Sequence, residues 1–124
     1  MIEGLAAAAV EPLLAVARER IDRRLGDLAD RLELDHPGNL GAALAYALRS
    51  PGKRVRPALV LAAYRAAGGA SEAIDGVATA VEVVHTYSLI HDDLPCMDDD
   101  ATRRGRPTTH VEFGVDVATQ VGWL

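Results

Sequence analysis

The sequence predicts an all-α fold. Apolar residues recur three or four positions apart along most of the chain, and no stretch alternates apolar and polar residues as a strand would. Alanine, the residue with the highest helix propensity, occupies 22 of the 124 positions. Because its side chain buries little area and lets helices approach closely, we expect a thin helical core. The length allows a single domain.

Helix boundaries are predicted from prolines, glycines and capping residues. Four helices are expected over residues 11–34, 40–48, 57–67 and 71–93, and a fifth from residue 115 to the last residue. Pro12 would lie in the first turn, Asn39 would cap the second helix, and Pro107 would open a short helical turn. Pro95 lacks an amide hydrogen, so the fourth helix should kink or end within the acidic run that follows. Because the chain stops within a helix, it resembles a truncated domain.

Composition excludes several functional classes. With 18 acidic residues against 13 lysines and arginines, the net charge of -5 argues against a general nucleic-acid or anionic-membrane binder. Apolar runs are broken by charge before the roughly 20 residues that a bilayer span requires. The single cysteine, Cys96, forms no internal disulfide, and residues 1–4 lack a basic stretch ahead of an apolar run. We therefore expect a cytoplasmic protein without a signal peptide, membrane span or nucleic-acid partner.

An acidic run between His91 and Asp100 holds five carboxylates within nine positions. These groups would repel one another unless a cation lay among them. Carboxylates without a thiolate or a paired imidazole favour hard cations, and Mg²⁺ commonly shares its coordination with a substrate phosphate. The run therefore predicts a Mg²⁺-phosphate site, and a solvated acidic turn is the alternative.

Two basic clusters accompany the acidic run. One follows it directly and consists of Arg103, Arg104 and Arg106. The other lies in a region, residues 36–71, that contains no acidic residue; it consists of Arg49, Lys53, Arg54 and Arg56. Clusters without local acidic partners favour an anion, and Gly52 beside Lys53 lets backbone amides approach a phosphate, although a plain turn is the alternative there. Together the three clusters predict two polyphosphate sites, one using metal and one using Lys and Arg directly.

One helical face is expected to carry polar side chains towards the acidic run. His85 and Ser88 precede Asp92 by seven and four positions, so a continuous helix places all three on one side. The ring of Tyr87 would project beside them and block or floor a cavity. A buried core histidine and a core aromatic are the alternatives. Trp123 is expected in the core.

These motifs resemble those of the trans-type (all-E) isoprenyl diphosphate synthases, also called polyprenyl synthetases. Segments 52–57, 82–98 and 103–108 reproduce the order and spacing of that family, and the resemblance extends from about residue 40 to the last residue. It implies a transferase of isoprenoid biosynthesis with an isoprenoid-synthase-type helical bundle. The chain would supply the N-terminal helices, as one partial domain over residues 1–124 truncated on its C-terminal side.

The resemblance also implies residue roles. Asp92 and Asp98, assisted by Asp93, would bind the Mg²⁺ ions that hold an allylic diphosphate, and Arg103 would contact the same diphosphate. Asp92, Asp98 and Arg103 are thus the implied catalytic residues. The residues implied for isopentenyl diphosphate are Lys53, Arg56, His85 and Arg104, with Gly52 and Arg54 shaping the pocket. In such enzymes the allylic C–O bond ionises, isopentenyl diphosphate attacks the cation and a proton is lost.

Product length and assembly are implied less directly. Tyr87 and Ser88 occupy the chain-length positions of the family, and Pro95-Cys96 matches an insertion found in bacterial farnesyl and plant-type geranylgeranyl diphosphate synthases. A large ring at Tyr87 would shorten the hydrocarbon pocket, since a helical turn gives only about 5.4 Å of depth. Farnesyl diphosphate is the predicted product, geranylgeranyl diphosphate the alternative, and a homodimer the implied assembly.

The chain also departs from the family, because a second aspartate-rich block is absent. We therefore expect a fragment of a longer protein, a chain completed by another subunit, or a non-catalytic partner that only binds prenyl diphosphate. A separate alternative comes from the His91-Asp92 doublet with His85 upstream, as in HD-type metal phosphohydrolases, which use metal-activated water. That alternative does not explain the Arg103-Arg104 pair or the basic loop at Gly52.

Overall fold

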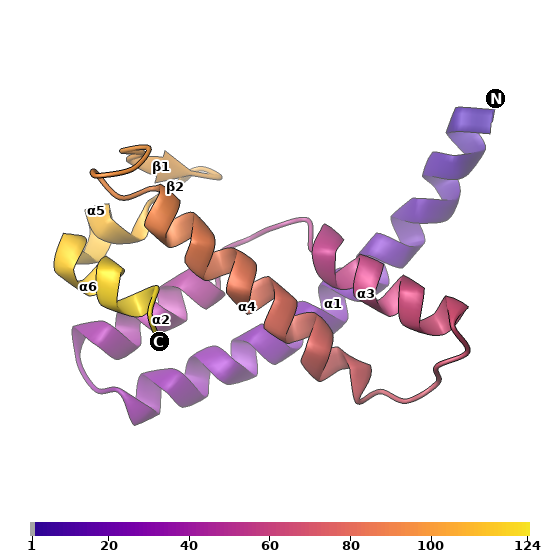
Figure 1. The fold of residues 1–124 in the computed structure, drawn as a ribbon, viewed down its shortest axis with the longest axis horizontal. Helices are drawn as coiled ribbons and strands as arrows, with labels where there is room; N and C mark the ends of the chain where they lie inside the picture. The colour runs from indigo at the N-terminus through magenta and orange to yellow at the C-terminus, as the bar shows by residue number, and fades with distance from the viewer. Residues whose placement is uncertain (1) are drawn as a thin grey trace. The chain divides into compact units, whose positions relative to one another are not determined.

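The computed structural model describes residues 2–124, without the side chains of residues 2, 3, 5, 6 and 7, and confirms the helical fold. Its helices are α1 (Ile2–Asp35), α2 (Asn39–Leu48), α3 (Val55–Ala66), α4 (Ile74–Asp92), α5 (Thr109–Phe113) and α6 (Val115–Val121) (Figure 1). Two short strands, β1 (Thr102–Arg103) and β2 (Arg106–Pro107), lie between α4 and α5. The prediction that no signal peptide begins at residues 1–4 includes Met1, which lies outside the described residues.

The start of the first helix was predicted wrongly. α1 begins at Ile2, and Pro12 lies inside it rather than in its first turn. A proline in a helix interior costs about 3 kcal/mol because it lacks the amide hydrogen and its ring crowds the preceding turn. The alanine-rich sequence before Pro12 has a high helix propensity, and the helix continues through the proline.

Two other helices begin away from their expected caps. Asn39 is the first residue of α2, and the N-cap is Gly38, whose φ of 89° suits a glycine. α4 begins at Ile74, after a turn in which the Ser71 hydroxyl accepts a hydrogen bond from the Ala73 amide (3.1 Å). The predicted helix end ahead of Pro95 is confirmed, since α4 stops at Asp92.

The strand pair is the element that the sequence pattern missed. β1 and β2 pair antiparallel, with Arg103 opposite Arg106. The two residues between them, Arg104 and Gly105, both have positive φ, 52° and 76°, as a tight hairpin turn requires. Strands of two residues are too short to show an alternating pattern. After the hairpin, α6 ends at Val121, so the last predicted helix is shorter than expected.

The described residues form two compact units, each made of two chain segments. Unit 1 contains the chain up to Arg24 and residues 52–82, and unit 2 contains residues 25–51 and 83–124. Both α1 and α4 contribute to each unit. The buried apolar side chains of unit 1 are Ala17, Ile21, Pro57, Ala58, Leu61 and Ala78.

In unit 2, α5 and α6 pack against α2. The core cluster there consists of Ala43, Leu44, Ala47, Ile90, Leu94, Ala118 and Val121. Half of the buried hydrophobic side chains in the described part of the chain are alanine, which agrees with a thin core.

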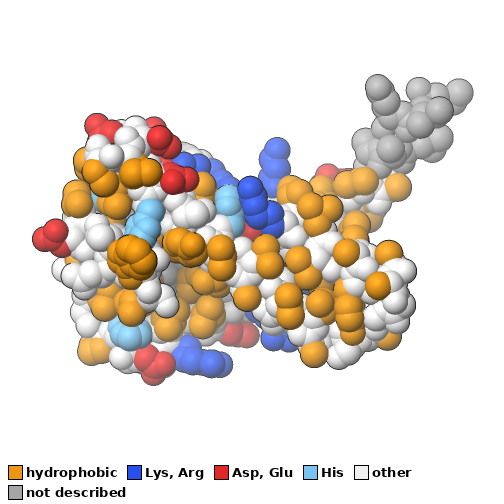
Figure 2. Space-filling model, viewed as in Figure 1, with side chains coloured by type: hydrophobic (Ala, Val, Ile, Leu, Met, Phe, Trp, Pro, Cys, Tyr) orange, Lys and Arg blue, Asp and Glu red, His pale blue; other side chains and the backbone are white. Residues whose placement is uncertain are grey.

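Many hydrophobic side chains nevertheless stay at the surface, as Figure 2 shows on the face in view. Trp123 is 79% exposed, so its expected place in the core was wrong. Trp123 follows the last turn of α6. The centroid of its ring lies 5.5 Å from that of His91. Among residues 2–124, no helix combines the length and apolar character needed to cross a membrane.

Candidate functional site

The acidic run folds back on the end of α4 through backbone hydrogen bonds. The Asp98 amide donates to the Asp92 carbonyl (2.8 Å), and the Asp100 amide donates to the Asp93 carbonyl (3.1 Å). Leu94, 6% exposed, anchors the loop in the core of unit 2. The Asp92 and Asp98 residues are exposed, so their carboxylates can reach a ligand from solvent.

Asp93 differs from its neighbours because it is only 3% exposed. Both of its oxygens accept hydrogen bonds from Arg103, at 2.8 Å from Nε and 2.6 Å from Nη2. The Asp93 hydrogen bonds, together with the charges of Asp93, Asp100 and Asp92, raise the pKa of Arg103. Arg103 is therefore a permanently charged guanidinium fixed beside the acidic run.

The acidic residues fit a magnesium ion that is shared with a ligand. In the part of the chain that the structure describes, no three His, Cys, Asp or Glu side chains gather into a metal site. Asp93 is engaged by Arg103, which leaves Asp92 and Asp98 as the exposed oxygen donors of the first part of the loop. Mg²⁺ suits such a set, because it keeps several waters and takes other oxygens from a substrate diphosphate.

The hairpin after the acidic run is fixed to α2 by Tyr46, a residue that the sequence analysis did not single out. The Tyr46 hydroxyl donates to the Pro107 carbonyl (2.6 Å), and the Arg106 guanidinium lies 3.9 Å from the centre of the Tyr46 ring. Arg106 is therefore engaged in holding the hairpin. Arg104, in the turn, donates a hydrogen bond to the Pro51 carbonyl. No local pattern around Tyr46 signals these contacts, which span about 60 residues of chain.

The basic cluster at residues 49–56 has no acidic residue near it in the sequence, but Arg49 pairs with acids from another segment of the chain. Arg49 in unit 2 pairs with Asp30 and with Glu33 (3.3 Å). The Asp30 hydrogen bond is the main cause that raises the pKa of Arg49. Both acidic partners lie on α1, outside the acid-free region 36–71, so the local sequence does not reveal them.

Arg54, in unit 1, likewise pairs with acids that lie far from it in the sequence. Its side chain is only 5% exposed and pairs with Glu82 (2.9 Å) and Asp22 (2.7 Å). Lys53 and Arg56 on either side of it are exposed. The basic loop thus contains one buried arginine, Arg54, whose ion pairs are structural, and two exposed cations, Lys53 and Arg56.

The face of α4 that was expected to carry polar groups lies on one uninterrupted helix. The Ser88 hydroxyl donates to the His85 carbonyl (2.7 Å), and both residues are half-buried. Tyr87, 42% exposed, borders an apolar groove in unit 2 of about 390 Å³. Other residues that line this groove are Leu44, Leu48, Val84, Ile90 and Trp123.

The contacts of His91 disfavour the phosphohydrolase alternative. His91 Nε2 donates to the Thr119 carbonyl (3.2 Å) on α6, and the His91 ring is near those of Tyr87 and Trp123, at centroid distances of 6.0 and 5.5 Å. A Cβ atom at Gly122 would lie 1.9 Å from the same nitrogen, so the helix end packs tightly on the ring. His91 therefore packs against α6, whereas Asp92 is exposed.

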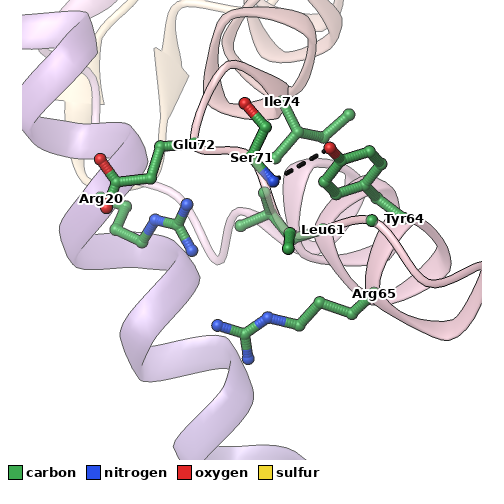
Figure 3. Close-up of a pocket in the computed structure, with 9 residues that line it drawn as sticks. Arg20, Leu61, Tyr64, Arg65, Ser71, Glu72 and Ile74 are labelled. Atoms are coloured by element: carbon green, nitrogen blue, oxygen red, sulfur yellow. Dashed lines mark hydrogen bonds between the residues drawn. The ribbon is translucent and has the colours of Figure 1, made fainter.

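A second, polar pocket of about 170 Å³ lies in unit 1, where Arg20 and Arg65 extend towards it from α1 and α3 (Figure 3). Tyr64 and Ser71 also line it, and the Ser71 amide donates to the Tyr64 hydroxyl (3.1 Å). The Arg20 charge is compensated by Asp75, and Glu72 also lines the pocket. Because both signs of charge line it, this pocket has no marked preference for an anion.

Comparison with known proteins extends the motif resemblance. Residues 37–124 match the polyprenyl synthetase family. Farnesyl diphosphate synthase of Bacillus subtilis (strain 168) is 45% identical over 109 residues, which are 88% of this chain and 36% of that protein. Geranylgeranyl pyrophosphate synthase 4 of Arabidopsis thaliana is 46% identical over 112 residues, 90% of this chain and 29% of that protein.

The fold is also that of solved structures. The crystal structure of a geranyltransferase from Legionella pneumophila aligns with a TM-score of 0.82 at 38% identity, covering 94% of this chain and 40% of that one. The chain thus spans about two fifths or less of the length of these relatives. The family match over most of the chain confirms the resemblance seen in the motifs. The chain belongs to the polyprenyl synthetase family.

Proposed function

We propose that this chain provides the diphosphate-binding portion of a trans-prenyl diphosphate synthase. The reaction is the condensation of isopentenyl diphosphate with an allylic diphosphate, dimethylallyl or geranyl. The observation that chiefly supports this proposal is the exposed pair Asp92 and Asp98, folded together at the end of α4 beside an arginine that Asp93 holds in place.

The acidic loop would bind the allylic diphosphate. Mg²⁺ bound there would neutralise the charge that collects on the diphosphate as the allylic C–O bond breaks. Asp92 and Asp98 would hold the ion, and Arg103 would donate hydrogen bonds to oxygens of the leaving group. Asp93 would act mainly on Arg103, because both of its oxygens already accept hydrogen bonds from that guanidinium.

The second diphosphate would bind without metal. Lys53 and Arg56 are the exposed cations of the loop at Gly52, and Arg104 and His85 are the other residues that we propose for isopentenyl diphosphate. Charge-assisted hydrogen bonds would hold its diphosphate while its double bond attacks the allylic carbon. The electron pair of the broken C–O bond leaves with the first diphosphate, and loss of a proton from the condensed cation completes the product.

We propose farnesyl diphosphate as the product, because the Tyr87 ring borders the apolar groove of unit 2. Geranylgeranyl diphosphate is the alternative. Replacing Tyr87 by alanine is expected to lengthen the product of a complete enzyme that contains this chain, since removal of the ring deepens the groove. Mass analysis of the products measures this. Val77→Ala removes an exposed apolar side chain from α4 outside the groove and should leave product length unchanged; an unchanged product from Tyr87→Ala would exclude a role for the ring.

We also propose that the protein functions in the cytoplasm as a homodimer. The exposed thiol of Cys96 suits a reducing compartment. Exposed apolar side chains such as Leu59 and Val84 suit association with another protein surface.

A Mg²⁺-dependent condensation assay tests the proposed function. The chain is incubated with labelled isopentenyl diphosphate and geranyl diphosphate, and products are identified by mass. Where self-association of the chain supplies the missing wall of the site, farnesyl diphosphate that disappears in the Asp92→Ala variant is the expected result. Ligand binding that depends on Mg²⁺ but yields no product would instead favour a non-catalytic binding subunit. Release of inorganic phosphate without carbon-carbon bond formation would favour the phosphohydrolase alternative.

A further inference from the structure

Arg54 is anchored in unit 1 by both its side chain and its backbone. Its Nη1 donates to Glu82 Oε1 (2.9 Å) and its Nε donates to Asp22 Oδ1 (2.7 Å). Its carbonyl accepts a hydrogen bond from the Ala58 amide (3.1 Å), so the residue also begins α3 as its N-cap. One side chain therefore ties the start of α3 to α1 through Asp22 and to α4 through Glu82.

The backbone of Arg54 is held in an uncommon conformation. Its φ of 58° lies in the left-handed region, which residues with a side chain adopt in only a few per cent of cases. Such a conformation persists where surrounding contacts enforce it. Here the two carboxylates supply those contacts, and Pro57, fully buried, fixes the same segment three residues later.

The anchored residue stands between two exposed cations. Lys53 precedes Arg54 and Arg56 follows it by two positions, and both are exposed whereas Arg54 is 6% exposed. The positive φ at Arg54 turns the chain between them, so the spacing of the two cations depends on this one conformation. Without the ion pairs of Arg54, the loop would become ordered only when the ligand binds. The entropy lost in ordering the loop would then weaken binding.

We propose that Asp22 and Glu82 are positioning residues for the site formed by Lys53 and Arg56. They hold Arg54 in the left-handed conformation that presents the two cations to a diphosphate. This inference rests on the proposed function, because it concerns the cations proposed for isopentenyl diphosphate.

The direction of the change in diphosphate affinity distinguishes a positioning role of Asp22 from a purely electrostatic one. Removing a carboxylate close to a basic site lowers its repulsion of an anion, so charge alone predicts tighter diphosphate binding in Asp22→Asn. Loss of positioning predicts weaker binding. Asp22 is well suited to this comparison because its own side chain is 48% exposed, and because asparagine removes the charge but keeps an oxygen towards the buried Arg54 Nε.

The test measures affinity for isopentenyl diphosphate in EDTA by isothermal titration of the full chain. Asp22→Asn is expected to raise the Kd about threefold to tenfold, the effect of ordering one or two more side chains on binding. Glu82→Gln should act in the same direction, and Glu82→Asp, which keeps the charge, should restore part of the affinity. The matched control is Asp75→Asn, which removes an acid of the same unit that pairs with Arg20 and Arg24.

Each outcome decides the inference. Weaker binding in Asp22→Asn, with Asp75→Asn and Mg²⁺-dependent geranyl diphosphate binding unchanged, supports it. Unchanged or tighter binding in Asp22→Asn overturns it, and so does an equal loss in Asp75→Asn, which would reflect stability alone. If the unaltered chain binds no isopentenyl diphosphate, the proposed function of Lys53 and Arg56 fails and the inference falls with it. If the unaltered chain binds and Asp22→Asn binds equally, only the inference fails.

Discussion

Replacing Arg54 by methionine is expected to lower the free energy of unfolding by about 3–5 kcal/mol, the usual effect of removing one partner from a buried ion pair. Glu82 is only 3% exposed and would lose its guanidinium partner in the interior of unit 1. Urea denaturation followed by circular dichroism measures the change. A methionine side chain fills much of the volume of the arginine stem, so the loss reflects charge pairing more than a cavity.

The control for this prediction is Arg49→Met. Arg49 also pairs with two acidic side chains, but its side chain is 45% exposed and the pairs are accessible to water. Exposed pairs contribute little to stability, so the urea midpoint should hardly move. In the double variant Arg54→Met/Glu82→Leu, much of the lost stability should return, because neither charge remains buried. Equal losses in the two single variants would contradict the structural importance of the buried pair.

Replacing Asp92 by asparagine is expected to weaken Mg²⁺-dependent binding of geranyl diphosphate by more than about a hundredfold. Loss of a residue that only supports a metal ligand already costs about tenfold to a hundredfold, and Asp92 is proposed as a ligand itself. Asparagine keeps the shape of the side chain, so the change isolates the carboxylate charge. Isothermal titration with geranyl diphosphate in the presence of Mg²⁺ measures the effect.

Asp99→Asn provides the matched control. Asp99 belongs to the same acidic run, is exposed, and has a φ of 53°, a conformation that asparagine tolerates well. The two variants therefore change the net charge identically. The Asp99→Asn chain should bind within about twofold of the unaltered chain, since an exposed charge outside the proposed ligand set is screened by salt. Similar losses in both variants would mean that the acidic run acts only through its total charge.

Features encoded locally could be predicted from the sequence. Pro95 correctly indicated where α4 ends, because the missing amide hydrogen acts within one helical turn. Glycines and prolines likewise indicated the breaks between the first four helices. The order and spacing of the basic and acidic motifs identified the family.

Contacts between distant segments could not be predicted in the same way. Arg54 pairs with residues 28 and 32 positions away, so a local region without acids suggested an unpaired cation. The pairing of Asp93 with Arg103 could not be predicted either, because it requires the hairpin, whose strands are too short to leave a pattern. The roles of Asp92, Asp93 and Asp98 as metal ligands stay predictions, as do those of Lys53 and Arg56 in diphosphate binding.

The most direct test of the account is whether the two diphosphates differ in their need for metal. The chain is titrated with isopentenyl diphosphate and with geranyl diphosphate, each with Mg²⁺ and with EDTA. We expect isopentenyl diphosphate to bind under both conditions and to lose affinity in Lys53→Ala, because its proposed site consists of Lys and Arg side chains. We expect geranyl diphosphate to bind only with Mg²⁺. An equal metal dependence of the two ligands, or the absence of binding by both, would contradict the account.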